Sequence, residues 1–504
     1  MLRHPRLKIM LMLSLLTVFT IATIGITARM TSLAKAATLT YASYGNQALT
    51  NMNNDFYTNG RWKSCLSCGA GNQDWGDDSM TYALWLRWKI NNHDASVIPE
   101  LQALAGTAPS YGPPCSSGNK CGDWSDVPMW DSIALGREYE ATGQSSSTIL
   151  SKEKAAFNTV DGAGSSVYAF GACSSVHYQQ PGGGGNKLKT LETDSNYIKA
   201  ALLLYRYTND SSYLTKAENE YAAVRQYFLD PHVALYSVYV FDNGSTCSQV
   251  QGRFFGSVNG NMIYNGLTLA ADTGNNAYRD QAIATGQAVN SNLSDARGVY
   301  TDLQAENDVV EPLVESMYDL ATQQSQSFAT SWLQAAASAS AASLKATGAY
   351  SRMFDGPANQ GTITIWQTNG GYALAFAEAG LNPNGTPDTA TAWANATSHN
   401  TSITTSSLPA SITFTGTGIA LIGTLGEQCC EGGHARVFID GNETTDTTGI
   451  WQNKSSSGRT IPNTVLFAWR WPSSGTHTIT IYPGIANGKE GNSFIHIQSY
   501  LVNP

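Results

Sequence analysis

Apolar positions recur with helical spacing from residue 39 to about residue 380, and one plan returns several times along this stretch. Residues 123–143 (DWSDVPMWDSIALGREYEATG) begin with acidic residues, continue as a predicted apolar helix and end in Thr-Gly, which terminates that helix. Closer or looser copies of this plan occur at 190–210, 256–274, 75–92, 305–322 and 362–380. The helix ends fall roughly 50–65 residues apart, which leaves room for one further helix in each interval. We therefore predict a mainly α domain, an (α/α)6 toroid of six helical hairpins.

The intervals between these segments carry the expected partner helices. Residues 41–56 form an amphipathic first helix, and outer helices are predicted at 147–157, 211–228, 276–292 and 325–346. In a ring of this kind, polar residues at one end of the inner helices face a common cleft. The Gly-rich stretch 158–187 is long enough to shape such a cleft, although it can equally be a surface excursion.

The pattern changes after Asn382-Pro383-Asn384-Gly385, so the helical domain is expected to cover 38–385. Residues 386–408 are rich in Thr, Ser, Asn and Ala and are predicted to be a linker. Residues 409–504 alternate apolar and polar positions between Gly, Asp and Asn turns, which predicts an antiparallel β-sandwich. Its sequence is similar to the jelly-roll accessory modules of secreted carbohydrate-active enzymes. Three tryptophans there could stack on sugar or belong to the core, namely Trp451, Trp469 and Trp471.

The N-terminus carries the features of an export signal. Three basic residues precede an apolar run over 9–26, and Ala34-Lys35-Ala36-Ala37 supplies a cleavage site. We predict a signal peptide over residues 1–37 and a secreted bacterial protein with no membrane attachment after cleavage. Because the apolar run is long enough to span a bilayer, an uncleaved anchor is the alternative.

Composition narrows the class of ligand. Only 13% of the residues are charged and the net charge is −9, whereas a nucleic-acid-binding protein needs a basic surface. The chain has 12 Trp and 24 Tyr, and aromatic faces of this kind stack on sugar rings or fill a core. We expect a polysaccharide or oligosaccharide partner, no cofactor and a monomer.

Eight cysteines in an exported chain favour disulfides over metal ligation. The pair Cys173 and Cys247 can close a long loop. The other candidates are small rings at Cys65/Cys68 and Cys115/Cys121, and a vicinal or free pair at Cys429/Cys430. A zinc site is disfavoured because the second pair has the wrong spacing and no His lies nearby, so no metal is predicted.

Acidic residues gather where the inner helices are expected to begin. Glycoside hydrolysis needs two carboxyl groups that flank the scissile bond, one neutral and one ionised. Four of the six predicted helix starts supply acids, namely Asp77/Asp78, Asp126, Glu192/Asp194 and Glu306/Asp308. Each acid has a second interpretation, because Asp and Glu at a helix start also cap the helix and interact with its dipole.

Residues 40–380 resemble glycoside hydrolase family 76. The resemblance rests on SDVPMWDSIALGREYEATG, on LETDSNYIKAALLLYRYTNDSSYLTKA and on IYNGLTLAADTG. It implies an (α/α)6 fold and an endo-acting α-1,6-mannanase or a related transglycosylating enzyme. Two consecutive aspartates mark that family, the first implied as the nucleophile and the second as the general acid/base.

This chain departs from that pattern at one of the two positions. Alignment on Trp130 places the first aspartate on Asp126 and the second on Val127, which cannot transfer a proton. Glu192 and Asp194, on the next inner helix, are the candidate replacements, so the predicted catalytic residues are Asp126, Glu192 and Asp194. The valine leaves open a sugar-binding protein that has lost catalysis. A toroid hydrolase of different linkage, or a lyase or unsaturated-uronide hydrolase, is a further alternative, although acidic helix starts disfavour anionic substrates.

Other residues are predicted to contact substrate. Trp124 and Trp130 could be sugar platforms, and Tyr264 and Asn265 could bind sugar hydroxyls. Trp130 can equally belong to the core, and Tyr264 and Asn265 can instead form a structural helix turn. The predicted substrate-binding set is Trp124, Trp130, Asp78, Tyr264, Asn265 and Asp308.

Overall fold

The structure is a computed structural model, and Thr40–Pro504 form one compact unit in it. It describes residues 39–63, 75–107, 125–161, 172–177, 188–249, 254–301, 310–343, 353–357, 365–388, 393–425, 433–444, 450–452, 461–484 and 495–504. The predicted signal peptide, Trp124, Glu306, Asp308 and six of the eight cysteines lie outside these residues. No helix among the described residues is long and apolar enough to cross a membrane.

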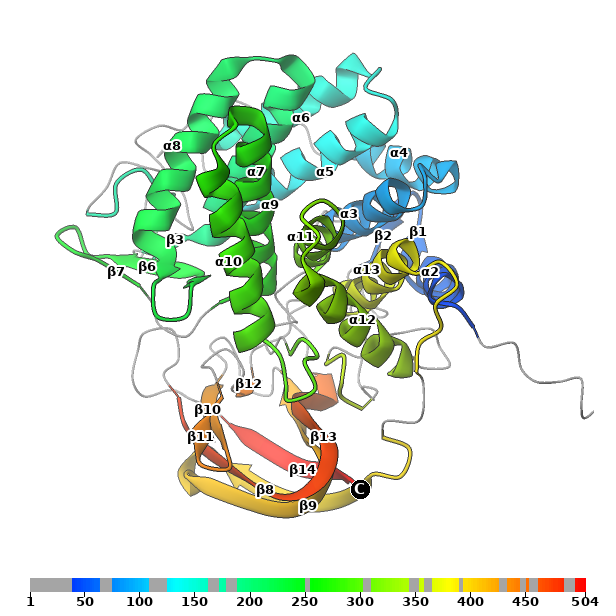
Figure 1. Cartoon of the computed structure of the whole chain (residues 1–504), viewed down its shortest axis with the longest axis vertical. Helices are drawn as coiled ribbons and strands as arrows, with labels where there is room; N and C mark the ends of the chain where they lie inside the picture. The colour runs from blue at the N-terminus through cyan, green and yellow to red at the C-terminus, as the bar shows by residue number, and fades with distance from the viewer. Residues whose placement is uncertain are drawn as a thin grey trace, which may run out of the picture. The chain divides into compact units, whose positions relative to one another are not determined.

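The described helices pair into six hairpins around a common axis, which confirms the predicted (α/α)6 toroid (Figure 1). The inner helices are α3 (Trp75–Ile90), α5 (Val127–Ala141), α7 (Leu191–Thr208), α9 (Gly256–Thr273), α11 (Glu311–Thr322) and α13 (Ile365–Leu381). The outer helices are α2 (Tyr41–Phe56), α4 (Ile98–Thr107), α6 (Ser147–Asp161), α8 (Ser211–Phe228), α10 (Asn276–Asn292) and α12 (Ser327–Ala342), and a 3-10 turn, η1 (Ala95–Val97), precedes α4.

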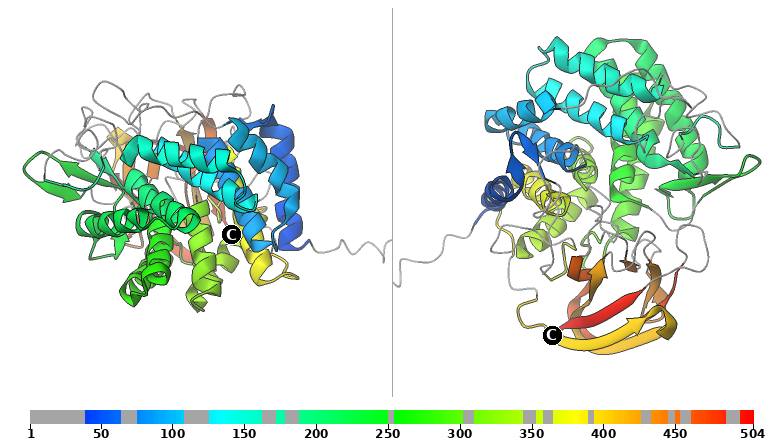
Figure 2. Two further views of the ribbon diagram at one scale, coloured as in Figure 1. Left: turned by 90° about the horizontal axis from the view of Figure 1, so that it is seen from above. Right: turned by 180° about the vertical axis from the view of Figure 1, so that it is seen from behind.

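Each inner helix packs on the next, and the ring closes where α13 contacts both α3 and α2. Figure 2 shows this closure: the blue α2 lies beside the yellow α13, although these are the first and the last helix in the sequence of the helical domain. In the order α3, α5, α7, α9, α11 and α13, the neighbours of α5 are α3 and α7, and those of α11 are α9 and α13. Helices α5 and α11 therefore lie opposite one another across the axis.

Burial separates the two sets of helices. From Leu191 to Leu204 every residue of α7 is buried, because other inner helices and its outer partner cover it on all sides. Outer helices such as α8 keep only one buried stripe. The start of α11 lies so close to α9 that a Cβ on Gly260 would come 2.4 Å from the backbone nitrogen of Leu313. Glycine at this position thus allows two inner helices to approach closely.

Two helices differ from the sequence-based expectation. Helix α4 was not identified from the pattern, and it follows a turn in which the side chain of Asp94 accepts a hydrogen bond from the backbone of Ser96. Helix α11 begins at Glu311 and not near residue 305. Pro312 explains this start, because proline lacks an N–H and is tolerated in the first turn of a helix but not in its interior.

Short strands join some of the helices on the ring. Two of these sheets are hairpins, and one has the order β3-β6-β7. Their strands are β1 (Tyr57–Thr58), β2 (Arg61–Trp62), β3 (Leu188–Thr190), β4 (Leu229–Asp230), β5 (Leu235–Tyr236), β6 (Tyr239–Asp242) and β7 (Cys247–Gln249). The predicted disulfide between Cys173 and Cys247 is present, and it joins the segment 172–177 to strand β7.

The C-terminal residues form a separate antiparallel sheet, in the order β11-β10-β13-β9-β14-β8 with β12 beside β10. Its strands are β8 (Thr397–Thr404), β9 (Ala410–Leu425), β10 (Gly433–Ile439), β11 (Asn442–Glu443), β12 (Ile450–Gln452), β13 (Ile461–Pro483) and β14 (His496–Asn503), and a 3-10 turn, η4 (Thr405–Ser407), follows β8. Strand β8 lies in the segment predicted as a linker, where it pairs with β14.

The sheet has its own core, in which Ile419, Leu421 and Phe467 are buried. Trp469 and Trp471 are half-buried at the edge of this core, and Trp471 stacks on His477. On β9, Ser411, Thr413 and Thr415 alternate with the core residues and are exposed.

Asp355 joins the helical ring to the sheet. Arg297, which follows α10, and Arg470 of β13 both form ion pairs with this buried carboxylate, at 2.7 and 2.8 Å. Gly356 beside it would place a Cβ 3.1 Å from that of Ala468 in β13.

Candidate active site

All six inner helices point their N-terminal ends toward the same end of the ring, because each returns through an outer helix before the next begins. The residues at these ends come together although they are far apart in the chain. This end of the ring is the candidate active site, and the sequence placed four acidic helix starts there.

Asp126 is the most distinctive of these acids. It stands at the N-cap of α5 but makes no side-chain capping hydrogen bond, so the capping interpretation does not account for it. The residue is 2% exposed, and its Oδ2 has no hydrogen-bond partner among the described residues. Burial raises the pKa of Asp126 to about 6. A carboxyl with this pKa is ionised at neutral pH and can still take up a proton, as acid–base or nucleophilic chemistry requires.

Glu192 and Asp194 stand in the first turn of α7, next to α5 in the ring, but they have different surroundings. Glu192 is 8% exposed, and the hydroxyl of Thr190 lies 3.4 Å from its Oε2. Asp194 is fully buried and accepts hydrogen bonds from the backbone and ring nitrogens of His177, at 2.9 and 2.5 Å. Asp194 therefore anchors the segment 172–177 to α7.

His177, Asp194 and Glu220 form a buried cluster of residue types that also bind metals. His177 Nδ1 lies 2.5 Å from Asp194 Oδ1 and 3.1 Å from Glu220 Oε1. Two ligands at about 2.0–2.2 Å from a tetrahedral zinc ion lie farther apart than 2.5 Å, so the cluster fits proton sharing better than zinc. Burial alone lowers the pKa of His177, but the two carboxylates outweigh it and raise the value to about 9.

At the start of α3, the two consecutive aspartates are both buried. Asp77 accepts hydrogen bonds from the side chain of Arg61, at 2.6 and 3.0 Å, and from the backbone of Trp62, at 2.8 Å. These contacts fix Asp77 against strand β2. Asp78 lies beside it at 7% exposure.

Glu311, the first residue of α11, was missed by the sequence analysis. It is 0% exposed, and neither carboxyl oxygen has a hydrogen-bond partner among the described residues. Burial raises the pKa of Glu311 to about 8. The signal that could have revealed it is the following Pro312, which places a helix start at this residue and not six positions earlier.

Deeper in the ring, Glu315 of α11 forms ion pairs with cations from other inner helices. Its carboxylate lies 2.7 Å from Arg137 of α5, 2.8 Å from Lys199 of α7 and 3.4 Å from Lys89 of α3. The hydroxyl of Tyr82 also donates to it. Burial opposes ionisation of Glu315, but the three cations outweigh that effect and hold its pKa well below the usual range. Burial lowers the pKa of Lys199 to about 7 despite this contact.

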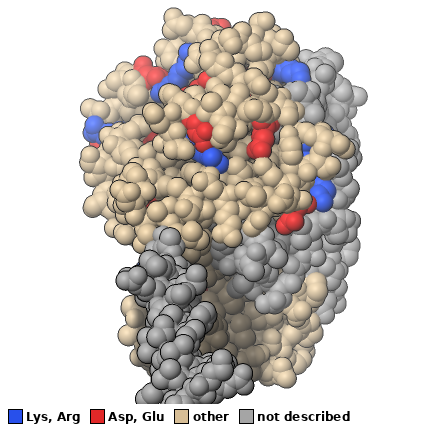
Figure 3. All heavy atoms as spheres, turned by 90° about the vertical axis from the view of Figure 1, so that its right-hand side faces the viewer, with Lys and Arg blue, Asp and Glu red and all other residues tan. Residues whose placement is uncertain are grey.

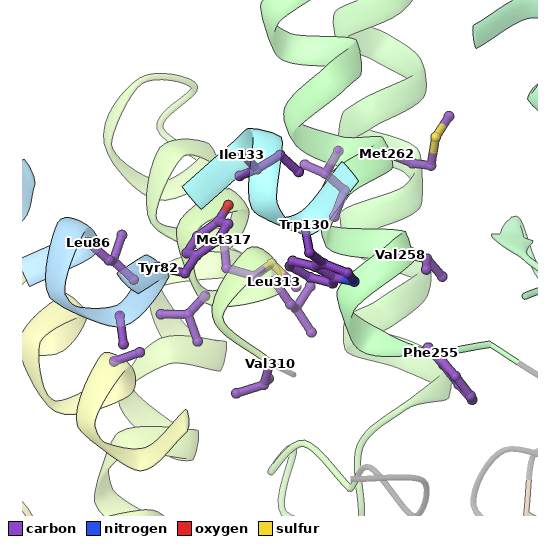
Figure 4. Packing of buried hydrophobic residues seen from close by; sticks show 14 of the residues in the cluster. Tyr82, Leu86, Trp130, Ile133, Phe255, Val258, Met262, Val310, Leu313 and Met317 are labelled. Carbon is purple, nitrogen blue, oxygen red and sulfur yellow. The ribbon is translucent and has the colours of Figure 1, made fainter. Parts of the chain in front are cut away.

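The residues predicted to contact sugar occupy different depths. Trp130 is 6% exposed, and it points from α5 toward Leu313 of α11 in the core (Figure 4). Tyr264 lies below the ammonium group of Lys199, which is 4.1 Å from the ring centre. Asn265 donates a hydrogen bond to the backbone oxygen of Ser195, at 2.9 Å, and so joins α9 to α7. On the face drawn in Figure 3, charged side chains of described residues are few and scattered.

The sequence matches no protein-family model and no curated protein. The fold does match solved structures, which cover about two thirds of this chain. One is an inactive variant of a family 76 α-1,6-mannanase from a Salegentibacter species, with two neighbouring aspartates replaced by asparagine and α-1,6-mannotriose bound. It has a TM-score of 0.57 and 15% identity over 67% of this chain and 99% of its own.

Two further structures extend the comparison. A family 76 α-mannanase of Bacteroides thetaiotaomicron has a TM-score of 0.57 and 16% identity over 69% of this chain and 97% of its own. Dfg5 of Chaetomium thermophilum, in complex with glucosamine, has a TM-score of 0.52 and 11% identity over 69% of this chain and 92% of its own. The helical domain thus has the fold of the family 76 α-mannanases, as the resemblance implied.

Proposed function

We propose that this protein is an exported glycoside hydrolase that cleaves α-mannan-type polysaccharide, with α-1,6 linkages as its substrate. The observation that carries the proposal is Asp126, a buried carboxyl with one unpartnered oxygen at the mouth of α5. It stands on the fold of α-mannanases, one of which is described as inactive after replacement of two neighbouring aspartates.

The chemistry assigned to Asp126 is attack on the anomeric carbon. Its neighbour Val127 has no ionisable proton, so we assign the second carboxyl to another inner helix. The sequence nominated Glu192 and Asp194 for that role. Because Asp194 is hydrogen-bonded to His177, we assign it to positioning the segment 172–177, and we assign Glu192 to contact with the substrate at the mouth of the ring. Asp78, Trp130, Tyr264 and Asn265 complete the proposed site.

The test is product release from α-1,6-mannan by the wild type and by Asp126→Asn, Glu192→Gln and Asp272→Asn. Asp272 is the matched control, because it lies at the opposite end of inner helix α9 in an ion pair with Arg206. We expect the wild type and the control to release mannooligosaccharides, whereas Asp126→Asn loses at least about 10³-fold in kcat with its fold intact. Full activity of Asp126→Asn would show that the catalytic carboxyl lies elsewhere.

A second candidate function, sugar binding without catalysis, is favoured by Val127 at the position of the family's acid/base. Titration of the wild type with α-1,6-mannotriose during prolonged incubation separates the two functions. Tight binding with no shortening of the oligosaccharide would support a binding protein and contradict the hydrolase.

A further inference from the structure

Glu311 differs from the other acids at the mouth of the ring, because its carboxyl is fully buried and no other described residue bonds to it. Neither of its oxygens has a partner among the described residues. Asp77 is held by Arg61, Asp194 by His177, and Glu192 has the Thr190 hydroxyl near its carboxylate. Burial of an unpaired polar group costs free energy, so a residue kept in this state calls for a use beyond stability.

Glu311 lies opposite Asp126 in the ring. Helices α5 and α11 are opposite members of the ring, and each of the two acids stands at the start of its helix. One turn below Asp126, Trp130 points toward Leu313, two residues after Glu311 (Figure 4). The two helix starts thus lie on opposite sides of the same end of the ring.

The first turns of α11 are also held rigidly. Gly260 of α9 lets the backbone at Leu313 approach, and the hydroxyl of Ser316 donates to the backbone oxygen of Gly260 at 2.6 Å. One turn further on, Glu315 is fixed by its three cations. A carboxyl on such a helix start has a defined place, as a catalytic group needs.

Burial with unpartnered oxygens occurs elsewhere too, and the comparison is informative. Both carboxyl oxygens of Glu153 also lack a partner among the described residues. Glu153, however, belongs to outer helix α6 and faces Gly136 in the middle of α5, where a Cβ would come 2.7 Å from its Oε1. It is therefore remote from the helix starts and provides a matched control for a buried carboxyl.

We propose that Glu311 is the proton donor of the glycosidase reaction and takes the role that Val127 cannot fill. This inference rests on the proposed function. In the first step, the Glu311 proton moves to the glycosidic oxygen as its bond to the anomeric carbon breaks, while the Asp126 carboxylate forms a bond to that carbon. In the second step, water attacks the anomeric carbon, returns a proton to Glu311 and releases Asp126.

The protonation states suit this division of labour. Burial holds the pKa of Glu311 at about 8 and that of Asp126 at about 6, so at pH 7 the first is mainly protonated and the second mainly ionised. Pairs of carboxyl groups whose surroundings separate their pKa values are the usual basis of acid and nucleophile assignments.

The experiment compares two substrates in four proteins. Wild type, Glu311→Gln, Glu192→Gln and Glu153→Gln are assayed on α-1,6-mannan and on a 2,4-dinitrophenyl α-1,6-mannobioside, whose leaving group needs no proton. Loss of a general acid costs about 10²–10⁴-fold, so Glu311→Gln is expected to lose this factor on mannan and far less in the first step on the aryl substrate. Added azide, which attacks without a base, is expected to accelerate Glu311→Gln and to give a glycosyl azide.

The other variants make the outcomes distinguishable. Glu192→Gln and Glu153→Gln are expected to show no such dependence on the leaving group and no azide product. Equal losses of Glu311→Gln on both substrates, full activity on mannan, or the azide signature in Glu192→Gln would overturn the assignment while leaving the proposed function intact. A wild type that cleaves neither substrate would overturn both. If Glu311→Gln fails to fold, Glu311→Asp is used, with a reduced rate on mannan and a smaller loss on the aryl substrate expected.

Discussion

A single side chain, Asp126, illustrates how function and stability oppose one another in this protein. The carboxyl occupies a helix N-cap, where an aspartate normally stabilises the helix, but it makes no capping hydrogen bond. It is buried, and no cation of the described residues lies beside it, so its charged form is disfavoured. The sequence could indicate that this residue is acidic and stands at a helix start, whereas only packing could show that it is buried and unengaged.

We expect Asp126→Asn to stabilise the protein. Because the pKa in the folded state lies above the unfolded value of 3.8, stability from this group is fully present below about pH 4 and is lost as the pH rises through about 6. At pH 7 the substitution should therefore raise the free energy of unfolding by about 2–3 kcal/mol, and near pH 4 the gain should vanish. Urea denaturation at both pH values measures it.

The control for this prediction is Asp272→Asn, which removes a carboxyl from a partly exposed ion pair. It should change the free energy of unfolding by less than about 1 kcal/mol. A loss of stability in Asp126→Asn at pH 7 would contradict the buried, uncompensated state of the carboxyl.

At the level of elements, the inner helices act through their ends and through the charges they share on the axis. Apolar periodicity predicted most of these helices to within a few residues, because a long amphipathic or apolar pattern is a local property of the sequence. The predicted start of α11 was wrong, because the apolar spacing continues upstream of the true start, which Pro312 marks. That displacement is what concealed Glu311.

The Glu315 cluster should be a major stabilising element. Glu315→Gln leaves Arg137 and Lys199 buried with less compensating charge, and loss of one partner from such a group costs about 3–5 kcal/mol. Chemical denaturation at pH 7 should show a loss of this size. The control Asp280→Asn, in an exposed pair with Arg279, should cost less than about 0.5 kcal/mol. A loss below about 1 kcal/mol in Glu315→Gln would mean that Asp319, 2.9 Å from Lys89, compensates the cations.

On the scale of the whole molecule, a disulfide and a pair of ion pairs connect segments that are distant in the sequence. The disulfide between Cys173 and Cys247 spans 74 positions of sequence. It secures the segment whose His177 is hydrogen-bonded to Asp194 at the mouth of α7. Asp355, with Arg297 and Arg470, makes the corresponding tie between ring and sheet.

Removal of the disulfide tests the first tie. The double variant Cys173→Ser/Cys247→Ser is expected to lose about 2–4 kcal/mol in the free energy of unfolding, since a closed loop of this length restricts the unfolded chain. Equilibrium denaturation without reductant, compared with the oxidised wild type, measures the loss. An unchanged midpoint would show that the unfolded chain is not restricted by this bridge.

The sequence by itself determined the helical hairpins, their repeat, the antiparallel sheet, the low charge and the acidic helix starts. These features follow from local periodicity and composition, which can be recognised in the sequence without knowledge of the fold. Tertiary structure alone decided which carboxyls are engaged: Asp194 by His177, Glu315 by cations from three helices, and Glu311 by no described partner. The physical reason is ring closure. It brings Arg137 to Glu315 over 178 positions and sets α5 against α11, and no local pattern encodes such contacts.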